Sequence, residues 1–197
     1  NDIVPAVVAA VIGKLVTEKP LTKPAKAVGD KIILVGQTGN DGNDTLFRAG
    51  LAEQMRPAEA LFDEERVTME ASLAAFQTGR IKASSDLGAA GIGAAVCESA
   101  RYGGFGAEVS LSEVPLKVKD ITPEEILICE TQARMAFQVS PENTVEVMEA
   151  IQSKGATATV IGEITADDQE IFRYNDRIIA TIPNKPSKEV LKSLGES

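Results

Sequence analysis

Short apolar runs alternate along the chain with longer stretches in which apolar residues recur at helical spacing. Two β-branched runs, at residues 3–12 and 31–39, predict buried strands, the second leading into a loop. Further strands are predicted at 81–85, 107–111, 134–140 and 156–165. Two last apolar runs, IFRY and RIIATIP, flank Asn175 and Asp176 and predict a closing hairpin.

Helical spacing fills most of the intervals between these strands. Helices are predicted at 45–54, 64–77, 89–101, 122–129 and 140–154. Two have clear start signals, because Thr122-Pro123-Glu124-Glu125 has the form of a capping box and Ser140 precedes a proline. Gly79 and Gly155 are the predicted stops of the helices at 64–77 and 140–154. The pattern predicts an α/β (α+β) domain, a mixed sheet with helices mainly on one face.

Charge and hydropathy argue against two classes of binding partner, nucleic acids and membranes. The chain has 197 residues, a net charge of −9 and a pI of about 4.7. Because the basic residues are scattered, we expect no nucleic-acid partner. No apolar run reaches the roughly 18 residues of a membrane span, so no membrane role is expected. Two cysteines make no disulfide framework, and a cytoplasmic protein is predicted.

The sequence contains no histidine. This absence excludes Ser-His and Cys-His catalysis and histidine-ligated zinc. Cys97 and Cys129 lack a neighbouring base and are expected to be packed thiols. A metal bound here would be a hard cation held by carboxylates.

The stretch DLGAAGIGA, residues 86–94, is the first candidate site. It matches neither the Rossmann fingerprint, because Val96 stands where the third glycine belongs, nor the P-loop, because no Gly-Lys-Ser/Thr follows. One interpretation is an anion on the bare helix start with Mg²⁺ held by Asp86. The other is that Asp86 is a helix N-cap and the glycines only permit close packing.

A second candidate is Glu130-Thr131-Gln132, polar residues between an apolar helix and an apolar strand. Such a junction could place three polar groups at the rim of a pocket, or it could be an ordinary turn. The Gly-rich loop at 36–44 lacks the glutamate that would close an EF-hand, and a plain loop is expected there.

Three segments together resemble formylglycinamide ribonucleotide amidotransferase, the phosphoribosylformylglycinamidine synthase of purine biosynthesis. They are DLGAAGIGAAVCESARYGGFGAEVSLSEVPL, ITPEEILICETQARMAFQVSPEN and VIGEIT. The resemblance extends upstream through NDIVPAVVAAVIG and GDKIILVGQTGNDG. It implies the C-terminal domain of the aminoimidazole ribonucleotide synthetase-like unit. It also implies the family reaction, in which ATP activates the formyl amide of formylglycinamide ribonucleotide for attack by glutamine-derived ammonia.

The resemblance assigns roles to six residues. It implies that Asp86 binds Mg²⁺, and that Glu130, Thr131 and Gln132 contact the substrate. Gly88 and Gly91 belong to the matching backbone loop, as a candidate phosphate loop. No catalytic residue is expected in this chain, since the family's histidine lies in a domain that the chain lacks.

Two departures from the family pattern weaken the substrate assignment. Ala58 stands where the family has a substrate-contacting glutamine, and NDTLF, residues 43–47, replaces the family's GGATF. They favour an alternative, a relative that kept a nucleotide or metabolite site without ligation. Selenophosphate synthetases, thiamine-monophosphate kinases and hydrogenase-maturation proteins are further alternatives, against which ETQARM argues, and a purely structural domain is another.

The resemblance also implies an organisation and a set of partners. Residues 1–28 would be the last strand of a preceding ATP-binding-type domain and a connector, 29–183 the synthetase-like domain, and 184–197 a tail or linker. The implied cofactors are Mg²⁺ and ATP. The implied partners are the substrate, a glutaminase subunit and a small bridging subunit, and a homodimer through the sheet is left open.

Overall fold

The structure is a computed structural model that describes residues 20–41 and 61–185, together with positions 10, 12–14, 47 and 50. The strand predicted at 3–12 and the helix predicted at 45–54 lie almost wholly outside these residues, as does most of the tail from 184. In the described part, no helix has both the length and the apolar character needed to cross a membrane.

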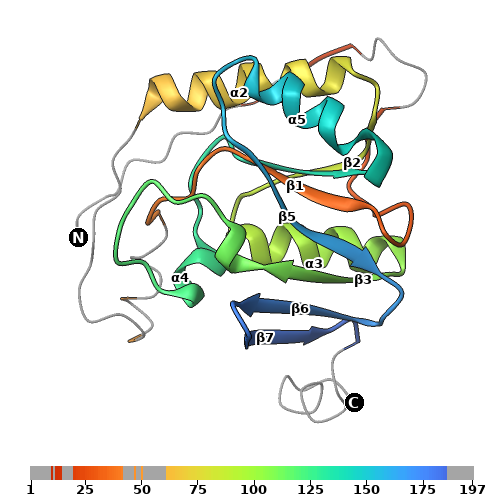
Figure 1. The fold of residues 1–197 in the computed structure, drawn as a ribbon, viewed down its shortest axis with the longest axis vertical. Coiled ribbons are helices and arrows are strands. Elements are labelled where there is room, and N and C mark those ends of the chain that lie inside the picture. The colour runs from red at the N-terminus through yellow and green to blue at the C-terminus, as the bar shows by residue number, and fades with distance from the viewer. Residues whose placement is uncertain are drawn as a thin grey trace.

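Seven strands and four α-helices form the described domain (Figure 1). The strands are β1 (Lys31–Val35), β2 (Ile81–Asp86), β3 (Gly106–Ser110), β4 (Met135–Val139), β5 (Ala158–Thr165), β6 (Gln169–Tyr174) and β7 (Arg177–Pro183). The helices are α2 (Phe62–Gln77), α3 (Gly91–Gly103), α4 (Pro123–Ile128) and α5 (Thr144–Gln152). Two short 3₁₀ turns, η1 (Leu111–Glu113) and η2 (Pro141–Asn143), complete the order.

The strands join in one sheet in the order β2-β4-β1-β5-β3-β6-β7. All neighbours are antiparallel except β3 and β6, so the sheet is mixed as predicted. The predicted hairpin is β6–β7, whose turn contains Asn175 at φ +51°. The mixed α/β fold class is therefore confirmed.

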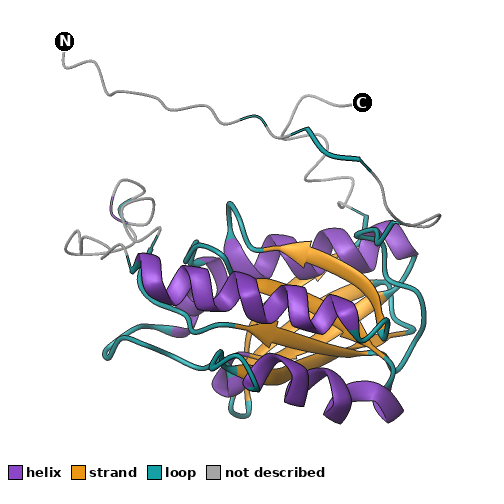
Figure 2. Cartoon of the chain, turned by 90° about the horizontal axis from the view of Figure 1, so that it is seen from above, coloured by secondary structure: helices purple, strands orange, loops and turns teal. Residues whose placement is uncertain are grey.

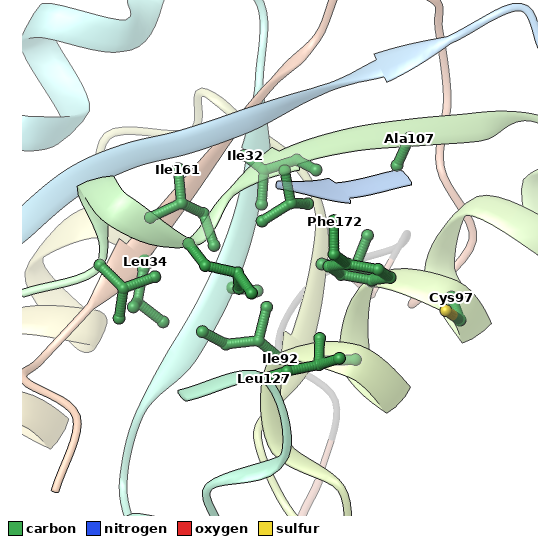
Figure 3. Close-up of a cluster of buried hydrophobic side chains, with 14 of the residues drawn as sticks. Ile32, Leu34, Ile92, Cys97, Ala107, Leu127, Ile161 and Phe172 are labelled. Atoms are coloured by element: carbon green, nitrogen blue, oxygen red, sulfur yellow. The ribbon is translucent and has the colours of Figure 1, made fainter. Parts of the chain in front are cut away.

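The placement of the helices differs from the prediction. Ile32 and Leu34 of β1 pack on the α3 side of the sheet, while Ile33 and Val35 pack on the side of α2 and α5. Figure 2 shows helices on both faces, and Figure 3 shows the cluster on the α3 side. The prediction of helices mainly on one face is wrong, because β1 is apolar on both faces and needs a cover on each.

The start of α4 forms as the sequence predicts. The Thr122 hydroxyl accepts a hydrogen bond from the Glu125 backbone N–H at 3.2 Å, and the Glu125 carboxylate accepts one from the Thr122 N–H at 2.8 Å. This reciprocal pair is the capping box, which satisfies two of the N–H groups that a helix start leaves free. It fixes where α4 begins and so where the segment after α4 lies.

Residues 22–30, here called the strap, bind to the sheet and to α3 before β1 begins. The Thr22 carbonyl accepts from the Ser84 N–H of edge strand β2 at 3.3 Å. The Ala25 N–H donates to the Ser99 carbonyl of α3 at 2.8 Å, and the Ser99 hydroxyl donates to the Lys23 carbonyl at 2.5 Å. These hydrogen bonds hold residues 22–25 against β2 and α3, and the strap covers part of the β2 edge.

Candidate functional site

Antiparallel pairing brings the two candidate segments of the sequence to one place. β2 ends at Asp86 and β4 begins at Met135, and these two residues are partners in the β2–β4 register. The segment that follows β2 therefore lies beside the segment that precedes β4, although 40 to 50 residues separate them in the chain. The candidate site is built at this end of the sheet.

A cavity of about 420 Å³ opens between this sheet end and α2. One wall is apolar and comes from α2, through Met69, Leu73 and Phe76. The opposite wall carries polar groups from the two candidate segments, with Asp86 and Gln132 among them. Its full lining is Met69, Ser72, Leu73, Phe76, Asp86, Leu87, Gly88, Gln132, Ala133, Arg134 and Met135. An apolar wall facing a few polar groups is typical of small-molecule sites.

Asp86 has an exposed carboxylate that accepts no hydrogen bond from a side chain of the described residues. Its side chain is 76% exposed, and its ion-pair partner among the described residues is the Lys23 ammonium, 3.9 Å away. The same ammonium donates to Glu98 at 2.7 Å, a bond that raises the pKa of Lys23 above its ordinary value despite partial burial. Asp86 is not the N-cap of α3, because the cap position belongs to Ala90, at φ 59° and with no side-chain hydrogen bond. The N-cap interpretation of Asp86 is wrong.

The two glycines of the loop play different parts. Gly91 has φ +51°, and a Cβ there would lie 2.0 Å from the Cys129 carbonyl oxygen. Only glycine lets α3 begin this close to the end of α4. At Gly88 a Cβ would meet nothing nearer than an Asp86 carboxylate oxygen, at 3.7 Å. The backbone at Gly88 is therefore open to the cavity, whereas Gly91 is closed by packing.

Glu130 links the two segments. Its carboxylate accepts a hydrogen bond from the Ala90 N–H at 3.4 Å, at the beginning of α3. The Gln132 amide donates to the Glu130 carbonyl at 2.7 Å and lies on the cavity wall. Of the three residues predicted as a group, Gln132 lines the same cavity as Asp86. Glu130 instead bonds to the start of α3, where the sequence analysis considered an anion site.

Thr131 points away from the cavity into the protein. Its residue is 5% exposed, and its hydroxyl accepts from the Gly39 N–H at 2.9 Å and donates to the Asp41 carboxylate at 2.5 Å. The Cys129 thiol lies 3.1 Å from the same hydroxyl. These contacts join the loop after β1 to the loop before β4, so the Thr131 hydroxyl is already occupied by structural partners.

Arg134 is the buried centre of this junction. The residue is 2% exposed, and its guanidinium donates to the carbonyls of Thr131 at 2.9 Å and Cys129 at 2.5 Å and to the Thr38 hydroxyl at 2.7 Å. Burial lowers the pKa of Arg134 below its ordinary value, and the nearby Asp41 charge opposes that shift. Three hydrogen bonds to neutral oxygens hold this charge in place.

The fit of a metal to this site depends on one carboxylate. Within the described ranges, no three Asp, Glu or Cys side chains are grouped so as to hold a metal ion. Mg²⁺ is commonly held by one or two protein carboxylates, waters and substrate phosphates rather than by a full protein cage. The exposed Asp86 carboxylate fits that limited role.

Several residues of the site carried no signal in the sequence. Lys23 lies in a proline-rich connector more than 60 residues before Asp86, and Glu98 is one acidic residue in an Ala-rich helix. The α2 wall could have been read as one face of a helix, but nothing in the sequence places that face beside Asp86. The pairing of β2 with β4 supplies the missing link.

Comparison with known proteins identifies the domain. Residues 27–175 match the family described as AIR synthase related protein, C-terminal domain. A curated relative, the phosphoribosylformylglycinamidine synthase subunit PurL of Methanosarcina mazei, is 35% identical in an alignment 189 residues long that covers 91% of this chain and 26% of the relative. The chain thus spans about a quarter of that relative.

Solved structures of PurL from Thermotoga maritima have the same fold. The complex with FGAR superposes with a TM-score of 0.73 at 27% identity, over 83% of this chain and 28% of that one. The complex with ATP gives 0.70 at 28% identity, and PurLQS gives 0.69 at 29% identity, each over 83% of this chain, with 26% and 27% of the respective structures covered. This chain belongs to the family of AIR synthase related proteins, through their C-terminal domain.

Proposed function

We propose that this chain is part of a phosphoribosylformylglycinamidine synthase and supplies one side of its active site. The reaction would join ammonia to formylglycinamide ribonucleotide, with ATP activating the amide oxygen. One observation carries the proposal: Asp86, Gly88 and Gln132, from two distant segments, line the same 420 Å³ cavity. Supporting it, the chain is similar to PurL over about nine tenths of its length.

The described residues would bind and orient rather than transfer protons. Asp86 would supply one ligand to Mg²⁺, which when bound neutralises charge on the phosphates of ATP. Gln132 would hold the substrate by its amide, and the apolar α2 wall would exclude water from that side. Glu130 would position the loop through Ala90, and Thr131 would act through the junction rather than by direct contact.

The finer assignments belong to the same proposal. Gly88 would leave backbone space for a phosphate, whereas Gly91 would fix the packing of α3. Residues 1–28 would connect from a preceding ATP-binding-type domain, and residues 184–197 would be a tail or linker. A glutaminase subunit and a small bridging subunit would be partners, as the PurLQS assembly of the relative suggests. A homodimer through the sheet and a cytoplasmic location complete the proposal.

A second function, ligand binding without ligation, is favoured by the substitution at Ala58. That residue and the altered 43–47 loop, with the exception of position 47, lie outside the described residues. Under this alternative the cavity would still bind a nucleotide or metabolite. The two functions differ in whether a longer protein containing this domain turns over formylglycinamide ribonucleotide.

Calorimetric titration of the chain with formylglycinamide ribonucleotide, with and without Mg²⁺, tests the proposal. Saturable binding should be lost in Asp86→Asn and Gln132→Ala. Two exposed residues away from the cavity give matched controls, Asp176→Asn in the β6–β7 turn and Gln152→Ala in α5. Unchanged, Mg²⁺-sensitive binding in Asp86→Asn would contradict the metal role, and unchanged binding in Gln132→Ala would contradict the substrate role.

A further inference from the structure

Lys23 lies in a small notch beside the main cavity. The notch has a volume of about 170 Å³ and is lined by Lys23, Asp86, Gly88, Ala89, Ala94, Ala95 and Glu98. Asp86 and Gly88 belong to both hollows, so the Lys23 ammonium approaches the Asp86 carboxylate from the side opposite α2. A cation that binds Asp86 must therefore do so close to a fixed positive charge.

The position of Lys23 is built into the fold. Its carbonyl accepts from Ser99, and the next-but-one residue, Ala25, donates to the same helical residue. A Cβ on Gly103 would come within 2.6 Å of the Ala25 carbonyl oxygen, so α3 and the strap are in close backbone contact. The ammonium itself is bonded to Glu98 at 2.7 Å and lies 3.9 Å from Asp86. Lysine is thus held near Asp86 by its backbone and its side chain together.

The Lys23 ammonium interacts more strongly with Glu98 than with Asp86. Glu98 is in direct hydrogen-bond contact, whereas the contact with Asp86 is an ion pair without a hydrogen bond. As far as the described residues go, the Asp86 oxygens therefore remain available to another ligand, while the positive charge of Lys23 lies close by. Compared with a neutral side chain at this position, the lysine charge weakens the attraction of Asp86 for a free divalent ion and strengthens it for a ligand whose net charge is negative.

We propose that Lys23 is a positioning residue that makes Asp86 accept a divalent metal together with its phosphate ligand in preference to the free metal ion. The inference rests on the proposed function, in which Asp86 is a metal ligand. A metal–nucleotide complex carries net negative charge, so the lysine attracts its phosphates while Asp86 takes the metal. Free Mg²⁺ or Mn²⁺ is attracted by Asp86 but repelled by the lysine, so Lys23 lowers its affinity.

Titrations with Mn²⁺ alone and with Mn²⁺–ATP, followed by the electron paramagnetic resonance signal of Mn²⁺ and by calorimetry, test this preference. In Lys23→Met we expect Mn²⁺ alone to bind about three- to tenfold more tightly, and Mn²⁺–ATP to bind more weakly by a similar factor, given one charge near 4 Å in a partly hydrated notch. Lys23→Arg should keep the parent preference. Lys26→Met is the matched control, since Lys26 is an exposed strap lysine bonded only to the Thr22 hydroxyl in the described structure.

Asp86→Asn separates the failure of this inference from the failure of the proposed function. If Asp86→Asn binds both probes as the parent does, Asp86 is no metal ligand and both proposals fall. If Asp86→Asn weakens binding but Lys23→Met leaves both affinities unchanged, or shifts them in the same direction, only the role of Lys23 is overturned. Thermal unfolding of each variant, followed by circular dichroism, shows that the affinities are compared between folded proteins.

Discussion

The two segments that form the candidate site differ in how far their polar groups are already used. The junction at 129–134 has a buried hydroxyl and a buried guanidinium whose hydrogen bonds all end inside the protein. The segment after β2 has an exposed carboxylate and an open glycine backbone. We call Gly91, Thr131 and Arg134, which are held by close packing or internal hydrogen bonds, the wall of the site. Asp86, Gly88 and Gln132 are the residues left to meet a ligand.

The strongest test of the wall is Gly91→Ala. The added Cβ would lie 2.0 Å from the Cys129 carbonyl oxygen on a backbone with φ +51°, so α3 must move away from the junction. We expect the free energy of unfolding to fall by roughly 3 kcal/mol or more, measured by urea denaturation with circular dichroism. Gly88→Ala is the matched control and should cost less than about 1 kcal/mol. Equal effects at the two glycines would remove the distinction between wall and open loop.

Removal of the buried guanidinium should have the next largest effect. Arg134→Met keeps much of the stem but leaves the Cys129 and Thr131 carbonyls without their donor. A loss of about 2 to 4 kcal/mol of unfolding free energy is expected in the same urea experiment. The control Arg66→Met, whose exposed ion pairs lie along α2, should stay within about 0.5 kcal/mol of the parent. A small effect at Arg134 would mean that the junction does not depend on it.

Thr131 tests whether the wall is also a ligand contact. Thr131→Val removes a hydroxyl that bonds Gly39 and Asp41, and should cost about 1 to 3 kcal/mol of stability. Thr131→Ser keeps the hydroxyl and should cost less than the valine variant. If Thr131→Val unfolds like the parent but loses substrate binding, the residue belongs with the ligand-contacting segment instead.

Glu170 is a buried carboxylate outside the site, in contrast to the exposed Asp86, and its burial should make the stability of the protein depend on pH. Glu170 of β6 is 0% exposed, and its carboxylate lies beside the Cys97 thiol, a weak hydrogen-bond donor. Burial raises the pKa of Glu170 above its ordinary value, while Arg101 partly opposes the shift. The folded state therefore holds the proton more tightly than the unfolded state, so stability should fall as pH rises from the ordinary glutamate value through the raised one.

Glu170→Gln removes this titration. The variant should be more stable than the parent by about 1 kcal/mol at pH 8 and lose the fall in stability between pH 4.5 and the raised pKa. Urea denaturation across pH measures both. The neighbouring Cys97 thiol, whose pKa burial raises to about 12, stays neutral throughout this range. A parent whose stability rises with pH over the same interval would contradict the assignment.

The smallest expected change in stability is at the ligand-meeting segment. Asp86→Asn alters an exposed side chain whose one ion pair in the described structure, with Lys23, is at 3.9 Å. We expect its unfolding free energy to stay within about 0.5 kcal/mol of the parent. A loss of about 2 kcal/mol or more of unfolding free energy would mean that Asp86 has a structural role, like the wall residues, and that its carboxylate is not available to a ligand.

The sequence predicted local structure well because the signals for it are local. The capping box at Thr122, the turn at Asn175 and the helix that ends before Gly79 are each set by a few adjacent residues. The cover of helices on both faces does have a signal in the sequence. The run KIILV is apolar at successive positions, which indicates burial on both faces of the sheet rather than one.

The site was harder to predict because its geometry depends on strand order. Asp86 and Gln132 were both candidates, but only the pairing of β2 with β4 shows that they share a cavity. The burial of Arg134 could not be read from ETQARM, since a lone arginine in a polar stretch usually lies at the surface. Lys23 depends on a strap whose contacts with β2 and α3 are remote in sequence.

The strap also bears on how this domain could be inherited or transplanted. A cut at the predicted border between residues 28 and 29 would leave β1 intact but remove the chain that lies on the β2 edge and against α3. The severed domain would expose edge N–H groups and a bare helix groove, a surface prone to self-association. A recombinant domain that is to fold correctly must therefore begin no later than Thr22, inside the segment that the sequence predicts to be a connector.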